Sequence, residues 1–381
     1  MFYYDYQKHN VYFAKCANLA EPILEEELLE LGAYETNQAF KGVYFKAEKE
    51  TFYKILYLSR ISSRILAPLI SFNCHNEKQL YKKCHEIDWS KIFGVSKTFA
   101  CFATVANSKM RNSQFASLKL KDAIVDRFNK DLGKRPNVDP KSPDIWINLN
   151  ISNNKASISL DASGGSLDKR GYRKTTVEAP CGETLAATIL RIIKFDENQS
   201  LYDPMCGSGT FLAEALMKIA NVPNLYNREK IGISLFPDFD KDLWDNVKNE
   251  CDKRVYLKDP NCIQGSDISK SSVAAAKSNL ENIPHGKKVI IKIADFNNLD
   301  GLKDKVIVLN PPYGGRIGDK SKLKELYSEF GDFLKQKCQN STCYMLIGDL
   351  ELIKSIGLRT SFKKPIYNGG LECRLVKLDI Y

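Results

Sequence analysis

The sequence contains few of the residues that most often carry hydrolytic or metal chemistry. Only four of its 381 residues are histidines, and none lies near a candidate nucleophile in the chain. Eleven cysteines are scattered without a CxxC pair. The sequence therefore favours neither a structural zinc site nor a Ser-His-Asp or Cys-His hydrolase, and we expect no metal. Reduced thiols in the cytoplasm fit this cysteine usage best.

Long apolar runs are also missing. No stretch of about 18 consecutive apolar residues occurs, so we expect no membrane span. The first residues, MFYYDYQKHNVYF, lack the cationic start and apolar core of a secretory signal, which again predicts a cytoplasmic protein. The composition, 43% hydrophobic and 27% charged, is typical of globular proteins, and the length predicts two or three domains.

The net charge of +10 is unevenly distributed along the chain. Residues 1–175 carry 27 Lys/Arg and 19 Asp/Glu, whereas the remaining residues carry 29 and 27. The excess lies between Lys97 and Lys174, with 15 basic and 7 acidic residues. This asymmetry predicts a polyanion-binding module joined to a nearly neutral domain. A solubilising surface is the alternative.

The first 165 residues predict two small α+β units. The first unit alternates strands and helices at 11–14, 18–31, 42–47 and 50–58, followed by an extended segment at 60–70. The second unit combines a helix at 77–87, a strand at 98–106, a helix at 112–129 and paired strands at 145–151 and 155–160. Lys119 and Lys121 on the helix at 112–129 are candidate contacts for RNA phosphates, or ordinary surface lysines.

A glycine- and serine-rich linker follows, with the sequence DASGGSLDKRGYRK at 161–174. It contains the densest basic run of the chain: Lys169, Arg170, Arg173 and Lys174 around Tyr172. Arginines with an aromatic residue between them suit RNA backbone contacts and base stacking, so these four cations are candidate RNA-binding residues. A cationic hinge without a ligand is the alternative.

From residue 178 onward, helices alternate with apolar strands, which predicts an α/β sheet. We expect strands at 201–203, 262–266, 289–293, 306–309 and 342–347, and a closing pair at 362–366 and 373–380. The first four strands end in or near a polar residue: Asp203, Asp267, Asp295 and Asn310. Because ligands bind at the carboxyl ends of parallel strands, these four side chains predict one shared crevice. Residues 222–261 form an insertion, which we expect to be partly helical.

The stretch LYDPMCGSGTFL at 201–212 gives the crevice a glycine-rich loop. After Asp203 and Pro204 come Cys206, Gly207, Ser208 and Gly209, and a helix opens at Thr210. Glycines permit positive φ, and the helix directs free N–H groups toward the same place. No Gly-Lys-Ser/Thr follows, so the loop is not a phosphate-binding P-loop. Taken alone, it fits a nucleotide-type loop or a plain strand–helix turn.

The sequence Asn310-Pro311-Pro312-Tyr313 indicates chemistry on an amine. The Asn310 oxygen and the Pro311 carbonyl could accept the two N–H hydrogens of a nucleobase amine and direct its lone pair at an electrophile. The prolines fix the loop without adding donors, and Tyr313 offers a face for stacking the base. An accidental Asn-Pro-Pro turn is the alternative.

These motifs together resemble a known family. DPMCGSGTF followed by NPPYGGRIG resembles the class I S-adenosylmethionine-dependent methyltransferases that act on exocyclic amino groups. DKRGYR at 168–173, EAPCGETLAA at 178–187 and YNGGLECRL at 367–375 are most similar to the THUMP-domain RNA guanine-N2 methyltransferases, in particular the bacterial large-subunit ribosomal RNA enzymes of the RlmL type in the UPF0020 family.

The resemblance implies an α/β fold with a ferredoxin-like domain at 1–65, a THUMP RNA-binding domain at 66–165 and a Rossmann-like class I methyltransferase domain at 166–381. It also implies S-adenosylmethionine as cofactor and a role for each motif. The residues expected at its methionine part are Asp203, Pro204, Cys206, Gly207, Ser208, Gly209 and Thr210, with Glu183 and Thr184 close to its amino-acid end. Asp267 would hold the ribose, Asp295 and Phe296 would face the adenine, and residues 310–313 would take the target guanine.

The activity implied is S-adenosylmethionine-dependent methylation of the N2 amine of a guanine in RNA, most of all in 23S ribosomal RNA. Three alternatives stay open: a transfer RNA guanine-N2 methyltransferase, a DNA adenine-N6 methyltransferase, and a non-catalytic RNA-binding factor of ribosome assembly. Some family members carry a second methyltransferase domain at the C-terminus. This chain ends at Tyr381 without one, so we expect a single modification.

Overall fold

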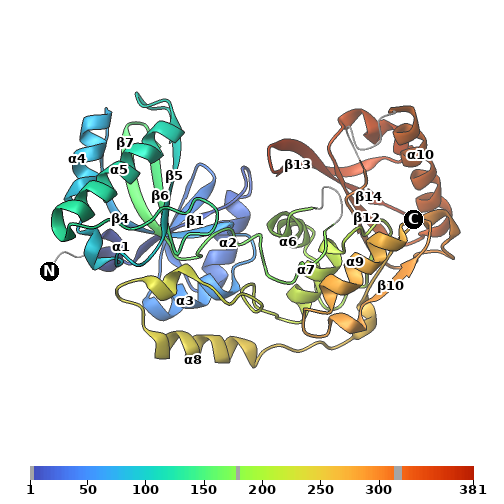
Figure 1. Cartoon of the computed structure of the whole chain (residues 1–381). Helices are drawn as coiled ribbons and strands as arrows, with labels where there is room; N and C mark the ends of the chain where they lie inside the picture. The colour runs from blue at the N-terminus through green and yellow to red at the C-terminus, as the bar shows by residue number, and fades with distance from the viewer. Residues whose placement is uncertain (1–3, 177–180, 313–319) are drawn as a thin grey trace.

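The computed structural model describes residues 4–176, 181–312 and 320–381. Within these ranges the chain forms two seven-stranded sheets, one in each half of the molecule (Figure 1). The strand order is β2-β3-β1-β4-β7-β6-β5 in the N-terminal sheet and β10-β9-β8-β11-β12-β14-β13 in the C-terminal sheet. Among the helices described, none is long and apolar enough to cross a membrane.

The two N-terminal units predicted from the sequence share one continuous sheet. The strand β4 joins them, because it pairs with β1 through Phe13 and Leu66 and with β7 through Leu66 and Asp161. Its apolar first half, Ile65 to Leu69, is buried between these neighbours. The elements of this half are α1 (Asp5–His9), β1 (Val11–Lys15), α2 (Glu21–Glu30), β2 (Tyr34–Ala39), β3 (Gly42–Lys46), α3 (Lys49–Leu58), β4 (Arg64–Asn73), α4 (Glu77–Glu86), β5 (Phe99–Ala106), α5 (Ser113–Leu132), β6 (Ile145–Ser152) and β7 (Lys155–Asp161).

The C-terminal sheet has the alternation that the sequence predicts. Strands β10, β9, β8, β11 and β12 run parallel, and β14 pairs antiparallel with β12. The carboxyl ends of β8, β9, β10 and β11 therefore lie along one edge. The elements are α6 (Glu183–Ile192), β8 (Leu201–Asp203), α7 (Thr210–Ile219), α8 (Lys241–Asp252), β9 (Ile263–Asp267), α9 (Lys270–Leu280), β10 (Ile290–Ile293), β11 (Val306–Leu309), α10 (Lys320–Lys337), β12 (Thr342–Ile347), β13 (Thr360–Asn368) and β14 (Leu371–Asp379).

Residues 222–261, predicted as an insertion, return to the N-terminal half and pack against it. Helix α8 lies along α3 (Figure 1), and the ring of Trp244 meets those of Tyr53 at 5.6 Å and Tyr57 at 5.7 Å. Asn224 Nδ2 donates to the Ser59 carbonyl at 2.6 Å. The C-terminal half therefore holds the N-terminal half with residues 222–261, a segment that we call the clasp.

We expect Trp244→Ala to lower the free energy of unfolding by about 3–5 kcal/mol, because truncating a buried aromatic side chain leaves a cavity. Trp244 is 7% exposed. Urea unfolding followed by circular dichroism measures this loss. Trp244→Phe, which keeps a ring in the same place, should lose less than half as much.

The matched control is Leu350→Ala, because Leu350 is an apolar side chain that is 47% exposed. Its substitution should change the free energy of unfolding by no more than about 0.5 kcal/mol. Equal unfolding midpoints for Trp244→Ala and the wild type would contradict the packing described for the clasp.

Candidate active site

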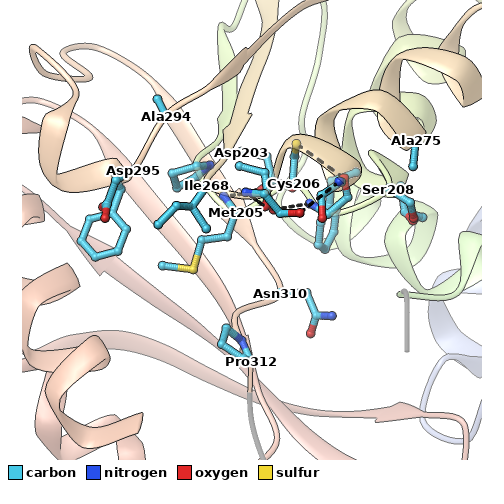
Figure 2. A pocket seen from close by; sticks show the side chains of 18 of the residues that line it. Asp203, Met205, Cys206, Ser208, Ile268, Ala275, Ala294, Asp295, Asn310 and Pro312 are labelled. Atoms are coloured by element: carbon cyan, nitrogen blue, oxygen red, sulfur yellow. Dashed lines mark hydrogen bonds between the residues drawn. The ribbon is translucent and has the colours of Figure 1, made fainter. Parts of the chain in front are cut away.

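A cavity of about 810 Å³ opens at the edge of the C-terminal sheet where β8, β9, β10 and β11 end (Figure 2). Asp203, Asp267, Asp295 and Asn310 all line it. The predicted convergence of the four strand ends is confirmed. The other lining residues that the sequence predicted as cofactor or substrate contacts are Pro204, Cys206, Gly207, Ser208, Thr210, Phe296 and Pro312.

The glycine-rich loop follows β8 and ends at the first residue of α7. Gly207 and Gly209 have φ values of +54° and +81°, a region that side chains with a Cβ rarely adopt. A Cβ at Gly209 would also lie 3.0 Å from that of Ala276 on α9. The loop therefore packs tightly against α9 and presents backbone N–H groups at the start of α7.

Three carboxylates order the backbone around the cavity. Asp267 accepts from the backbone N–H of Gly207 and of Ser269, both at 2.9 Å, and so links β9 to the glycine-rich loop. Asp203 accepts from Met205 N–H at 3.1 Å and is 2% exposed. Burial raises the pKa of Asp203 well above its usual range, and the charge of Asp267 raises it further. Asp295 accepts from the backbone of the short turn after β10.

Asn310 brings an unused acceptor to the same cavity. Its Oδ1 atom is buried and has no hydrogen-bond partner within the described part of the chain. Figure 2 shows the Asn310 side chain on the cavity below Cys206 and Ser208. An unsatisfied buried acceptor is costly, so this oxygen fits a donor that arrives with a ligand. Tyr313, the predicted stacking residue, lies outside the described residues.

The linker residues DKRGYR correct one sequence-based prediction. Arg170 is 1% exposed, and its guanidinium donates to Glu214 on α7 at 3.2 and 3.3 Å and to the carbonyls of Leu167 and Arg60. The predicted contact of Arg170 with RNA is therefore wrong for this structure, because all of its donors face the protein interior. Asp168, in the same segment, accepts from Thr184 N–H at 3.3 Å and caps α6.

Arg173 also points inward, toward the glycine-rich loop. It donates to Glu183 at 2.8 Å, to the hydroxyl groups of Ser208 and Thr210 at 2.9 Å each, and to the Cys181 carbonyl at 3.3 Å. Its predicted RNA contact does not fit this arrangement. No sequence signal links Arg173 to residues 35 and 37 positions away.

The other predicted cations stay candidates. Lys169 and Lys174 are exposed. On α5, Lys119 lies over the Phe115 ring at 5.5 Å and Lys121 pairs with Asp122 at 2.9 Å. Each keeps part of its side chain in solvent, so their RNA contacts remain predictions.

Glu183 and Thr184 lie behind the loop and are not among the residues that line the cavity. Glu183 reaches the loop only through Arg173, and burial raises the pKa of its carboxyl while Arg173 opposes that rise. Their direct contact with a cofactor stays a prediction. Thr175 and Thr176 are among the lining residues that were missed, because the sequence gave no sign that the linker reaches the cavity.

Comparison with known proteins identifies the class. Residues 170–377 match the UPF0020 family, described as the RMKL-like methyltransferase domain. The chain belongs to the UPF0020 methyltransferase family. Residues 74–161 match the THUMP domain and residues 12–66 the RlmL ferredoxin-like domain, so all three expected domain types are present.

Relatives match over nearly the whole chain. The slr0064 protein of Synechocystis sp., whose name assigns it provisionally to the RNA methyltransferases, is 37% identical over 373 residues, 97% of each chain. The ribosomal RNA large subunit methyltransferase K/L of Syntrophotalea carbinolica is 34% identical over 97% of this chain and 53% of its own length. This UPF0020 chain therefore spans about half the length of the K/L relatives.

Solved structures agree. The methyltransferase SMU.472, solved in complex with S-adenosylhomocysteine (SAH), has a TM-score of 0.84 at 26% identity over 97% of this chain and 98% of its own. TrmN of Thermus thermophilus shares the fold, with a TM-score of 0.71 at 16% identity over 97% and 99% of the two chains. S-adenosylmethionine is therefore the cofactor of this UPF0020 protein. The cavity fits it, because the first turn of α7 leaves backbone donors free and the buried Asp203 has no cationic partner among the described residues.

We expect the affinity for SAH to increase as the pH rises from acid toward neutral. Burial raises the pKa of Asp203, so its carboxyl holds a proton at pH values where an exposed one has lost it. In the predicted contact, the ligand's ammonium group favours the carboxylate. Binding should therefore release this proton, and acid should oppose binding. Calorimetric titrations in buffers of different ionisation enthalpy measure the proton release.

Asp203→Asn is the control, because its amide does not titrate. This variant should bind SAH more weakly and lose both the proton release and the dependence on pH. A wild-type affinity that stays constant over the acid-to-neutral range would contradict the assignment of Asp203.

Proposed function

We propose that this protein uses S-adenosylmethionine to methylate the N2 amine of a guanine in RNA, with 23S ribosomal RNA as the substrate. The observation that carries the proposal is the buried Oδ1 of Asn310 on the cofactor cavity, which has no hydrogen-bond partner among the described residues. A site for methyl transfer to an amine needs an acceptor at this position, whereas transfer to a hydroxyl or a carbon would need a base.

The chemistry follows from the weak nucleophilicity of a guanine amine, whose lone pair is delocalised into the ring. Asn310 Oδ1 accepts one N–H hydrogen of the amine and holds its nitrogen toward the glycine-rich loop. Pro311 is buried beside it and fixes the backbone. The bound cofactor supplies an electrophilic methyl group. Positioning and the two acceptors, Asn310 Oδ1 and the Pro311 carbonyl, therefore suffice without a strong base, because the methylated nitrogen is acidic and loses its extra proton to solvent.

RNA is supported as the substrate by the N-terminal half. It carries the excess of basic residues and a match to the THUMP domain, and its sheet is joined to the methyltransferase half through the linker and the clasp. A DNA adenine-N6 methyltransferase would share the chemistry of Asn310 but would not need the N-terminal RNA-binding half. A non-catalytic assembly factor would not need a buried acceptor on the cavity that finds no partner in the described part of the chain.

The choice of ribosomal RNA over transfer RNA rests on the names of the K/L relatives, which are large-subunit ribosomal RNA methyltransferases at about 35% identity over 95% of this chain. The choice of guanine N2 rests on the resemblance of DPMCGSGTF and NPPYGGRIG to amine methyltransferases and of DKRGYR to the guanine-N2 branch.

We expect Asn310→Ala to lower kcat at least about 100-fold, because it removes a positioned hydrogen-bond acceptor from the reacting amine. The Kd for SAH should stay within about twofold, since within the described residues the Asn310 Oδ1 makes no hydrogen bond to the glycine-rich loop. Asn310→Asp keeps an oxygen acceptor of the same size and should retain part of the activity. Transfer of a labelled methyl group to ribosomal RNA measures the activity of both variants.

The base is tested separately by digesting the methylated RNA and analysing its nucleosides by mass spectrometry. N2-methylguanosine should be the product, and a transcript with inosine at the modified position should accept no methyl group, because inosine lacks the N2 amine. Methylation of an adenine, or of the inosine transcript, would overturn the proposed specificity. Full turnover by Asn310→Ala would overturn the role of that residue.

A further inference from the structure

The linker between the two halves forms one wall of the cofactor cavity. Thr175 and Thr176 line it directly. Asn279 on α9 holds this wall, because its Oδ1 accepts from the backbone N–H of Lys174 and Thr175 at 2.8 and 3.0 Å and its Nδ2 donates to the Thr175 carbonyl at 2.8 Å. The same Nδ2 donates to the Ser208 carbonyl at 3.1 Å. The linker and the glycine-rich loop are thus tied to one buried amide.

Arg173 ties them a second time, through side chains. Its guanidinium reaches Ser208 and Thr210 on either side of Gly209, while Glu183 holds its Nε. Ser208 is 3% exposed and Thr210 is 4% exposed, so both hydroxyl groups lie behind the loop and away from solvent. Both residues also line the cavity.

We propose that Arg173 is a positioning residue that sets the cofactor affinity, by holding Ser208 and Thr210 so that the glycine-rich loop keeps its N–H groups directed into the cavity. This inference rests on the cofactor site and is independent of which base is methylated. It replaces the RNA contact that the sequence predicted for Arg173.

A guanidinium suits this task and an ammonium does not. The three nitrogen atoms of the Arg173 guanidinium lie in one plane and donate to a carboxylate, two hydroxyl groups and one carbonyl. A lysine at this position would place a single charged nitrogen there and could not reach Glu183, Ser208 and Thr210 together. Gly209, with its positive φ and no side chain, contributes a backbone N–H that donates to the Cys206 carbonyl at 2.8 Å, so side-chain support for the loop comes from its neighbours.

The test is Arg173→Lys in the full-length chain. This variant keeps the positive charge but loses the planar set of three nitrogen donors. Calorimetric titration with SAH should show a Kd raised at least about tenfold. KM for S-adenosylmethionine should rise in parallel, while kcat at saturating cofactor should stay within about threefold of the wild type. The control is Arg359→Lys, because Arg359 is exposed and outside the cavity lining; its Kd for SAH should not change.

A second pair of variants isolates the hydroxyl that Arg173 holds. Thr210→Val removes the hydroxyl at constant shape and should raise the Kd for SAH, whereas Thr210→Ser should recover most of the affinity that Thr210→Val loses. The double variant Arg173→Lys, Thr210→Val should lose less than the product of the two separate effects, because both disrupt the same contact.

Wild-type SAH affinity in folded Arg173→Lys would overturn the proposal. This holds equally if that variant loses thermal stability but keeps its affinity for SAH. This failure is distinct from failure of the proposed function. If the wild type methylates no guanine in RNA but Arg173→Lys still weakens SAH binding, the proposed substrate is wrong and the positioning role stands.

Discussion

The buried carboxylate of Glu214 is the interaction on which the arrangement of the two halves depends. Glu214 is 0% exposed and lies on α7, the helix that begins at the glycine-rich loop. Arg170 of the linker and Tyr172 donate to it, and the Arg60 guanidinium lies 3.8 Å away. A charge at this depth is stable only when it is paired, so removing a partner would cost on the order of 3–5 kcal/mol. The N-terminal half and the linker therefore must meet α7 in one geometry.

This constraint explains why residues of the N-terminal half and of the linker both support the cofactor site. Arg60 also donates to the Met217 and Val222 carbonyls at the end of α7, so the N-terminal half holds one end of that helix. At the other end, Arg173 holds Ser208 and Thr210. Asp267 and Asn279 hold the glycine-rich loop as well, at the Gly207 N–H and the Ser208 carbonyl. The shape of the loop is therefore supported in part by the chain that arrives from the N-terminal sheet.

The sequence predicts the C-terminal fold well because its signals are local. Apolar strands at 201–203, 306–309 and 342–347 have the predicted bounds, and the polar residue after each of four strands reaches the same cavity. These features follow from strand length, alternation and the geometry of a parallel sheet. The strand β2 was missed because its sequence, YETNQA, is polar and mostly exposed at the sheet edge.

What the sequence could not show are contacts between distant segments. Basic residues beside an aromatic one suit an RNA surface and a buried ion pair equally, and the partner that decides between them, Glu214, lies 44 residues beyond Arg170. The clasp shows the same limit. Its aromatic residues were visible, but Trp244 meets Tyr53 and Tyr57, nearly two hundred residues earlier in the chain, and no local pattern encodes that pairing.

Two of the contacts between the halves, Glu214 at the linker and Trp244 in the clasp, lie on different elements and act together. A hinge needs one axis about which the parts can turn, and two separate buried contacts remove that freedom. Under the proposed function, the RNA-binding half then holds its substrate at a fixed distance from Asn310. In that function the guanine must leave its own stack to reach the cavity, because an amine inside a helix is out of reach of the cofactor. The shape of the RNA therefore selects the nucleotide. Asn310 selects only for an amine on the base that enters the cavity.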